Sequence, residues 1–163
     1  MPAQLLARRC LVSGAGERVE ALPGRPPGAL LVLPSDAQLS TARVYAAFDA
    51  LGGGRSDVEL AELAEAIRSA EAAGELGPRL RHNDLAAAAV HCCPSIAAGL
   101  EELVAAGADQ AMVSGSGPTV VGFFDGSDGR RRAEAALARL AGRHRRAQVV
   151  ERVDERFATP RPA

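Results

Sequence analysis

The chain has 163 residues, a length that suits one ordinary domain and falls short of two full ones. Hydrophobic residues make up 47% and charged residues 24%, proportions that fit a folded globular protein and exclude wholesale disorder. The 19 basic residues are all arginine and nearly balance 20 acidic residues, to a net charge of -1. No overall positive field is therefore available to hold nucleic acid or an anionic membrane.

The same sequence excludes several kinds of partner and compartment. Aromatic residues are only 3%, so platforms for stacking nucleotide bases are lacking. No apolar run approaches the roughly 20 residues that span a bilayer, and the N-terminus lacks the apolar core of a secretory signal. Three cysteines, two of them adjacent, do not form a disulfide framework. We expect a cytoplasmic protein with reduced thiols that binds neither nucleic acid nor a membrane.

The first predicted elements are two short strands joined by a turn. Residues 10–12 and 17–22 have the composition of strands, and residues 13–16 contain the glycines of a turn. A cluster of proline and glycine at residues 23–28 ends this hairpin, because it can continue neither a helix nor a central strand.

The middle of the chain predicts one strand followed by helices. The apolar run at residues 29–33 is typical of a buried strand, and Ser40 or Thr41 can cap a helix that ends before the glycines at 52–54. Apolar residues at helical spacing predict three further helices, at residues 56–74, from Asn83-Asp84 onward, and at residues 94–107.

The C-terminal part predicts two strands, a helix and a last strand, at residues 110–113, 119–124, 128–140 and 148–153. The order is therefore strand, helices, strand, strand, helix, strand. This order suits an α+β fold, an antiparallel sandwich of ferredoxin-like type.

The segment most informative about chemistry is Ser114-Gly115-Ser116-Gly117-Pro118-Thr119. Its two glycines let backbone N–H groups converge, a geometry that can hold an anion. However, it lacks the lysine of a Walker loop and leads into a strand, so no helix dipole assists. From the residues alone, a glycine-rich β-turn is favoured over an anion site.

A metal site is not expected. His91-Cys92-Cys93 offers three possible ligands, but adjacent residues rarely converge on one ion. No second pair of ligands is spaced to complete a tetrahedral site.

Three segments, in the right order, resemble the GHMP kinase superfamily. Residues 113–124 resemble its third, C-terminal glycine-rich motif, while residues 39–45 and 82–85 resemble the 4-diphosphocytidyl-2-C-methyl-D-erythritol kinases within it. The hairpin at residues 13–20 resembles the stretch between the two domains of that family. The resemblance implies a division into a remnant of an N-terminal kinase domain, a ferredoxin-like C-terminal domain and a tail, at residues 1–27, 28–157 and 158–163.

The resemblance also implies an activity and its site. The implied enzyme uses ATP and Mg²⁺ to phosphorylate a hydroxyl group of its small-molecule substrate, 4-diphosphocytidyl-2-C-methyl-D-erythritol, in non-mevalonate isoprenoid biosynthesis. The residues that would shape the pocket around the transferring phosphoryl group and the acceptor hydroxyl are Ser114, Gly115, Ser116, Gly117 and Thr119. Ser40 and Thr41 would line the acceptor pocket, although both could equally serve as helix caps. Asn83 and Asp84 are interpreted mainly as caps of the following helix.

The resemblance aligns only to the second half of these enzymes. The family's ATP loop and N-terminal lysine belong to the first half, and its catalytic aspartate would stand immediately before Met1. We therefore expect no catalytic residue within the chain, and we expect a misplaced gene start or an interrupted gene as the cause. On this interpretation the chain alone is inactive and binds ATP weakly, with the N-terminal half as a partner in trans.

Two alternatives stay open. One is another GHMP kinase, acting on homoserine or a mevalonate derivative. The other is a non-catalytic, ferredoxin-like module that binds a ligand or a partner protein.

Overall fold

The structure is a computed structural model that describes residues 9–22, 27–73, 77 and 80–151. The chain divides into two compact units. The described residues of the smaller unit are 9–22, 57–73, 77 and 80, and those of the larger unit are 27–56 and 81–151. The division into residues 1–27, 28–157 and 158–163 stays a prediction, and residues 152–163 lie outside the described residues.

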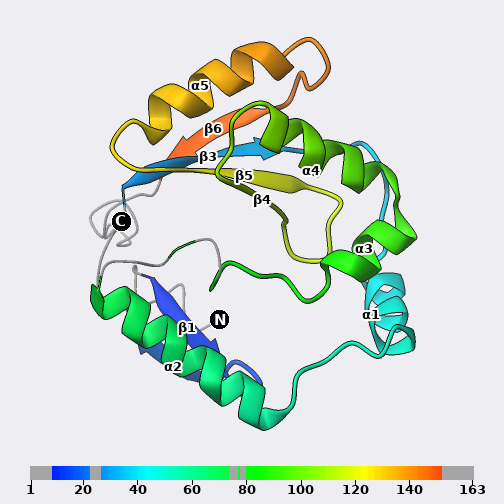
Figure 1. Cartoon of the computed structure of the whole chain (residues 1–163). Helices are drawn as coiled ribbons and strands as arrows, with labels where there is room; N and C mark the ends of the chain where they lie inside the picture. Colours follow the sequence, from blue (N-terminus) through cyan, green and yellow to red (C-terminus); the bar gives the residue numbers. More distant parts are fainter. Residues whose placement is uncertain (1–8, 23–26, 74–76, 78–79, 152–163) are drawn as a thin grey trace, which may run out of the picture. The chain divides into compact units, whose positions relative to one another are not determined.

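The smaller unit combines a β-hairpin with one long helix (Figure 1). Strands β1 (Cys10–Ser13) and β2 (Arg18–Ala21) pair antiparallel, which confirms the predicted hairpin. Helix α2 spans Asp57–Ala73. Its Arg68 donates from Nε to both carboxylate oxygens of Glu20, at 3.0 and 2.9 Å, and this pair ties α2 to β2.

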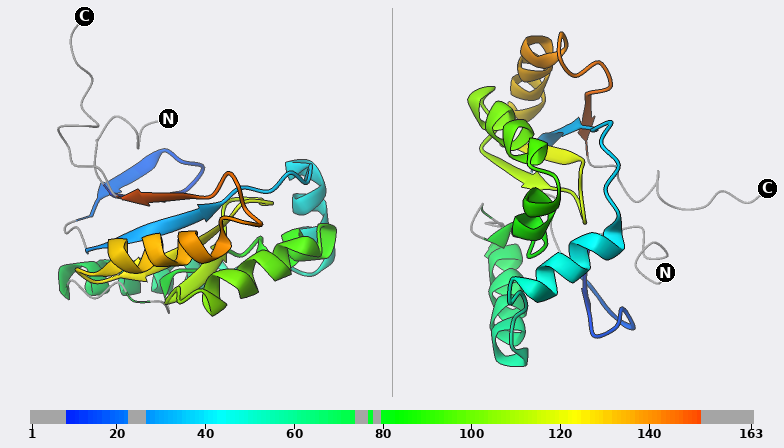
Figure 2. Two further views of the ribbon diagram at one scale, coloured as in Figure 1. Left: turned by 90° about the horizontal axis from the view of Figure 1, so that it is seen from above. Right: turned by 90° about the vertical axis from the view of Figure 1, so that its right-hand side faces the viewer.

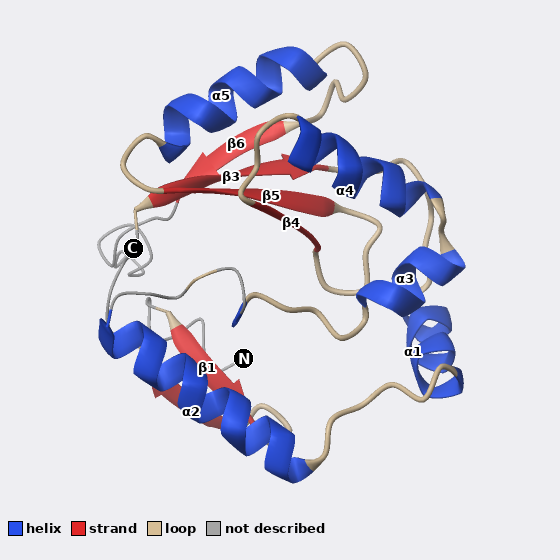
Figure 3. Cartoon of the chain, in the orientation of Figure 1, coloured by secondary structure: helices blue, strands red, loops and turns tan. Residues whose placement is uncertain are grey.

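A four-stranded antiparallel sheet forms the centre of the larger unit (Figure 3). Its strands are β3 (Gly28–Leu33), β4 (Gln110–Val113), β5 (Val120–Asp125) and β6 (Gln148–Glu151). Their order in the sheet is β4-β5-β3-β6, so the first strand of the unit lies between the third and the fourth. This order is that of a ferredoxin-like sandwich and confirms the predicted α+β class.

Two helices, α4 (Ser95–Ala105) and α5 (Gly129–Leu140), cover one face of this sheet (Figures 1 and 2). Burial alternates along β3, where every second residue from Ala29 to Leu33 faces the core, as the two-residue period of a strand requires. The largest fully buried side chains of the unit include Phe124 and Leu103. Burying these groups away from water stabilises the packing of both helices on the sheet.

A second pair of helices, α1 (Thr41–Ala50) and α3 (Ala86–Cys92), packs together through small buried residues. Ala88 and Ala89 of α3 and Val44 of α1 are at most 1% exposed. The third predicted helix therefore exists, but it begins at Ala86 and not at Asn83-Asp84.

None of the helices in the described part of the chain is long and apolar enough to cross a membrane. The expected cytoplasmic location stays a prediction.

Candidate functional site

The turn between β4 and β5 is closed by its own backbone. The N–H of Ser114 donates to the carbonyl of Thr119 at 2.9 Å, and the N–H of Gly117 donates to the carbonyl of Ser114 at 2.9 Å. Gly115 and Gly117 have φ values of 58° and 77°, a region that residues with a Cβ avoid. This loop, residues 114–119, therefore needs glycine at both positions to adopt its shape. We call it the glycine loop.

Two backbone donors of the glycine loop are left available. Within the described ranges, the N–H groups of Gly115 and Ser116 have no acceptor in the protein. A Cβ placed on Gly115 would meet no atom within 4 Å, so the loop is open at this point. Adjacent N–H groups at an open, left-handed turn can contact an anionic oxygen. The assignment of these residues to a phosphoryl pocket is consistent with this geometry and stays a prediction.

The start of α1 lies against the glycine loop. Thr41 Oγ1 is 3.0 Å from Ser116 Oγ, although the two residues are 75 positions apart in the sequence. The fold therefore brings together one residue of each set expected at the site. Ser40 plays a different part here, because its Oγ accepts the N–H of Arg43 at 3.5 Å and caps α1. A contact of Ser40 with a ligand stays a prediction.

Asn83 fastens the glycine loop to the segment before α3, a role that the sequence analysis missed. Its Nδ2 donates to the carbonyl of Val113 at 2.8 Å and to that of Gly115 at 2.7 Å. Its Oδ1 accepts the N–H of Leu85 at 3.0 Å. The interpretation of Asn83 and Asp84 as helix caps holds only in part: Asn83 Oδ1 accepts an N–H of the turn that leads into α3, but Leu85 occupies the N-cap position without a side-chain hydrogen bond. The two bonds from Nδ2 therefore tie this segment to the end of β4 and to the glycine loop.

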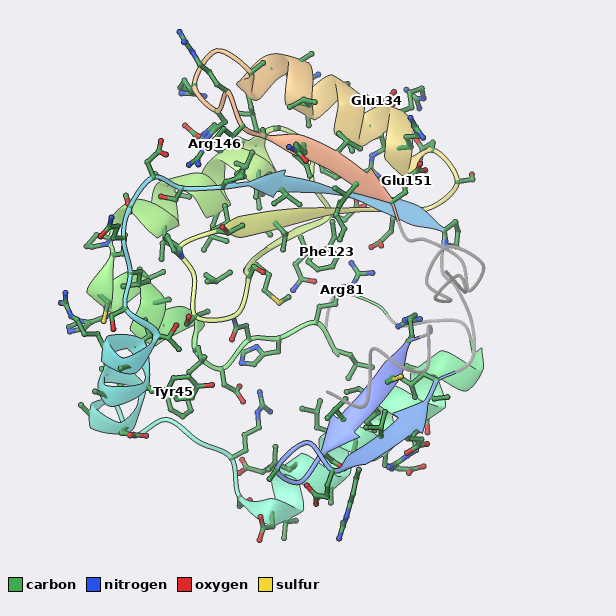
Figure 4. The ribbon with its side chains drawn as sticks, turned by 180° about the vertical axis from the view of Figure 1, so that it is seen from behind. Tyr45, Arg81, Phe123, Glu134, Arg146 and Glu151 are labelled. Atoms are coloured by element: carbon green, nitrogen blue, oxygen red, sulfur yellow. The ribbon has the colours of Figure 1, made fainter. Side chains whose placement is uncertain are left out.

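Arg81 anchors the segment that carries Asn83. Its guanidinium donates to both carboxylate oxygens of Asp125, at 2.8 and 2.7 Å, and lies 4.6 Å from the centre of the Phe123 ring. Its carbonyl accepts Nε2 of Gln110 at 2.8 Å. Figure 4 shows Arg81 beside Phe123, and the Arg81 side chain is only 7% exposed. The ion pair with Asp125 and the stacking on Phe123 hold this arginine against β5. The segment that it anchors carries Asn83, which bonds to the glycine loop.

Asp84 is held as a carboxylate and is a poor candidate for a base. Arg55 donates to it from Nε at 3.1 and 3.0 Å and from Nη2 at 2.8 Å, and His82 Nε2 lies 2.9 Å away. These hydrogen bonds from Arg55 lower the pKa of Asp84 below its usual value. A general base works best with a pKa near the working pH, so a lowered pKa argues against that role.

The described residues hold no group of three or more His, Cys, Asp or Glu side chains that could bind a metal ion. Cys93 Sγ instead lies 3.3 Å from Ser95 Oγ, in the turn before α4.

Comparison with protein families finds one match. The family model described as the C-terminal part of the GHMP kinases matches residues 60–145, just over half of the chain.

Curated relatives agree with this match. A protein of Nocardioides sp. named 4-diphosphocytidyl-2-C-methyl-D-erythritol kinase is 39% identical over 145 residues, which cover 87% of this chain and 48% of the relative. A protein of Gloeobacter violaceus with the same name is 40% identical over 137 residues, which cover 81% of this chain and 43% of the relative. The chain spans about half the length of the curated relatives it matches.

Solved structures support the same fold. The crystal structure of a 4-(cytidine 5'-diphospho)-2C-methyl-D-erythritol kinase matches with a TM-score of 0.63 and 31% identity, over 89% of this chain and 50% of the other. The L. major mevalonate kinase, in complex with R-mevalonate, matches with a TM-score of 0.55 over 84% of this chain and 46% of the other. Its identity is 19%, so this second likeness shows the fold alone.

Proposed function

The chain belongs to the GHMP kinases, and from this membership we propose that it forms the C-terminal, acceptor-binding part of a 4-diphosphocytidyl-2-C-methyl-D-erythritol kinase. The observation that carries the proposal is the identity of 32% to 40% to several relatives that all have this name. The reaction would transfer the γ-phosphoryl group of ATP to a hydroxyl group of the substrate, in the biosynthesis of isoprenoid precursors.

The glycine loop and the start of α1 supply the groups that such a reaction needs around the acceptor. The hydroxyl groups of Thr41 and Ser116 can each donate and accept, so together they can orient an alcohol oxygen. The free N–H groups of Gly115 and Ser116 can contact phosphoryl oxygens, whose charge is spread in the transition state. Asn83 would act as a positioning residue, because it bonds to the loop and not to the ligand. Arg81 would act one step further away, because it anchors the segment that carries Asn83 to Asp125.

The base and the nucleotide pocket belong to a different part of the proposed enzyme. Because the relatives are about twice as long as the aligned region, we propose that their other half supplies the ATP-binding loop and an aspartate base. This half would be joined in one chain or act in trans. Kinases of this kind use Mg²⁺ with ATP. The described residues hold no metal-binding cluster, so we assign no step to a metal.

A hybrid enzyme tests the proposal. The 163-residue chain replaces the matching C-terminal part of the Nocardioides relative, and ADP release is measured with ATP and 4-diphosphocytidyl-2-C-methyl-D-erythritol. We expect the hybrid to turn over and the chain alone to show no turnover. Within the hybrid, Thr41→Val and Ser116→Ala should raise the KM for the substrate and leave the KM for ATP nearly unchanged, because on this proposal both hydroxyls would contact the acceptor alcohol. The matched control is Ser127→Ala, which removes an exposed hydroxyl outside the glycine loop.

Two results would overturn the proposal. One is a folded hybrid that phosphorylates mevalonate or homoserine in preference to the named substrate. The other is turnover by the chain alone that Thr41→Val does not change, because a complete site would then lie elsewhere in these residues.

A further inference from the structure

A hollow lies in the larger unit beside the glycine loop, and Pro118 of that loop is part of its lining. Its volume is about 490 Å³, within the range of about 300–1,000 Å³ that is usual for pockets that hold small molecules. It is formed by the last residue of β3 and the three that follow it (33–36), the first turns of α4, and residues 143–146 between α5 and β6. We call it the arginine pocket. Figure 4 labels Arg146 in the connection between α5 and β6.

Positive charge is in excess in the arginine pocket. Arg143, Arg145 and Arg146 line it with two carboxylates, those of Asp36 and Glu102. Both carboxylates already have partners: Arg146 binds Asp36, and Arg143 Nη1 lies 3.2 Å from Glu102 Oε1. Arg145 has no carboxylate partner among the residues that the structure describes. The pocket therefore holds at least one uncompensated guanidinium.

Arg146 can add a second guanidinium to the same ligand. Its pair with Asp36 is open to solvent, since the two side chains are 59% and 94% exposed. An exposed ion pair contributes at most about 1 kcal/mol, so releasing Arg146 from Asp36 to bind another anion costs little. Phosphate is such an anion, because a guanidinium binds two of its oxygens with parallel N–H bonds.

The floor of the arginine pocket is apolar. Pro34, Ala98 and Pro118 supply its accessible apolar surface, since each is partly or largely exposed. Leu33, Ile96 and Val120 also line it but are only 2% or 3% exposed, so they add little surface for a ligand to cover. A free inorganic anion would leave this floor uncovered, whereas a ligand with a small hydrocarbon body would cover it and gain from the burial. The two kinds of lining therefore select a ligand with a charged head and an apolar body.

We propose that the arginine pocket binds a small organic phosphate ester, with the phosphate on Arg145 and Arg146 and the hydrocarbon part on the apolar floor. The proposal does not depend on the kinase activity, because none of the residues that carry it belongs to the acceptor pocket. Pro118 is the residue of the glycine loop that also lines the arginine pocket, so the ligand would contact this loop at Pro118.

The test is a titration of the ¹⁵N-labelled 163-residue chain with n-butyl phosphate, inorganic phosphate and n-butanol, followed by NMR. We expect butyl phosphate to shift the amide signals of residues 95–99 and 143–146, and to bind at least about tenfold more tightly than inorganic phosphate, since it alone covers the apolar floor. Butanol should produce no saturable shift. Spectra of the free variants show whether each one is folded.

Three variants make the test specific. Arg145→Gln should weaken butyl phosphate binding by about tenfold, as expected for the loss of one charged hydrogen-bonding partner. Ala98→Glu, at an exposed position in the lining, should abolish binding by adding a negative charge and no buried group. Arg131→Gln is the matched control, because Arg131 is 78% exposed and lies outside the pocket.

The proposal is overturned if the control weakens binding as much as Arg145→Gln does, since the anion would then respond only to net charge. It is also overturned if Ala98→Glu binds butyl phosphate normally. Equal affinity for inorganic phosphate and butyl phosphate would refute the role of the apolar floor and, with it, the organic ester as ligand.

Discussion

The two glycines of the glycine loop provide a matched pair of substitutions, Gly115→Ala and Gly117→Ala. Both residues have a left-handed backbone, with φ values of 58° and 77°. They differ in the space around them. A Cβ on Gly115 would meet no atom within 4 Å, whereas a Cβ on Gly117 would come within 3.2 Å of both Ile96 Cδ1 and Val113 Cγ1.

The structure sets a magnitude for each change. Alanine in a left-handed conformation costs about 1–2 kcal/mol, and this strain is common to both variants. Only Gly117→Ala adds crowding, and its neighbours Val113 and Ile96 are 0% and 3% exposed, so they have little room to move. Overpacking of this kind costs about 1–3 kcal/mol. We expect Gly117→Ala to lower the free energy of unfolding by about 2–5 kcal/mol, and Gly115→Ala by about 1–2 kcal/mol.

Urea denaturation followed by circular dichroism measures both variants against the parent chain. Equal losses would show that backbone strain alone decides the outcome and that the packing against Ile96 and Val113 contributes nothing. A greater loss for Gly115→Ala would refute the placement of the two glycines. Unchanged m-values would confirm that the variants unfold from a similar folded state.

Three further changes test other contacts. Asp125→Asn removes the charged partner of Arg81, whose side chain is 7% exposed, and should lower the free energy of unfolding by about 1–3 kcal/mol in urea. The pKa of Asp109 is lowered by hydrogen bonds from Arg132, so the ionised form is favoured in the folded chain. The stability that the ionised Asp109 contributes is present above the usual aspartate pKa of about 4 and is lost as the pH falls through the lowered pKa. In Asp109→Asn, Tm should therefore fall less steeply as the pH is lowered. Ser40→Ala removes the cap of α1 and should cost about 0.5–1 kcal/mol, measured as helix loss and reduced Tm.

The sequence was a good guide to the elements whose signals are local. The apolar run of β3, the periodic apolar residues of α4 and the capping serine of α1 each act within a few residues of one another, and the structure has all three elements. The order of these elements also limited the sheet to few topologies, which is why the ferredoxin-like arrangement followed from it.

The contacts that build the candidate site had no such local signal. The amide of Asn83 bonds to carbonyls 30 and 32 residues further along the chain, and Thr41 reaches Ser116 across 75 residues. An asparagine before a helix has the composition of a cap, so local reasoning assigns it that role. Only the folded chain shows that its amide is used elsewhere.

The position of β3 in the sheet has a consequence for synthesis of the protein. Its two neighbours, β5 and β6, are made much later, since β3 ends at Leu33 and β6 begins at Gln148. A ribosome therefore releases an apolar strand with both edges unpaired long before its partners leave the exit tunnel. Contacts this distant in sequence make folding slow, and the unpaired strand is open to wrong pairing meanwhile. Helices α1 and α3, which can pair with each other earlier, are the first part of the larger unit able to form on the nascent chain.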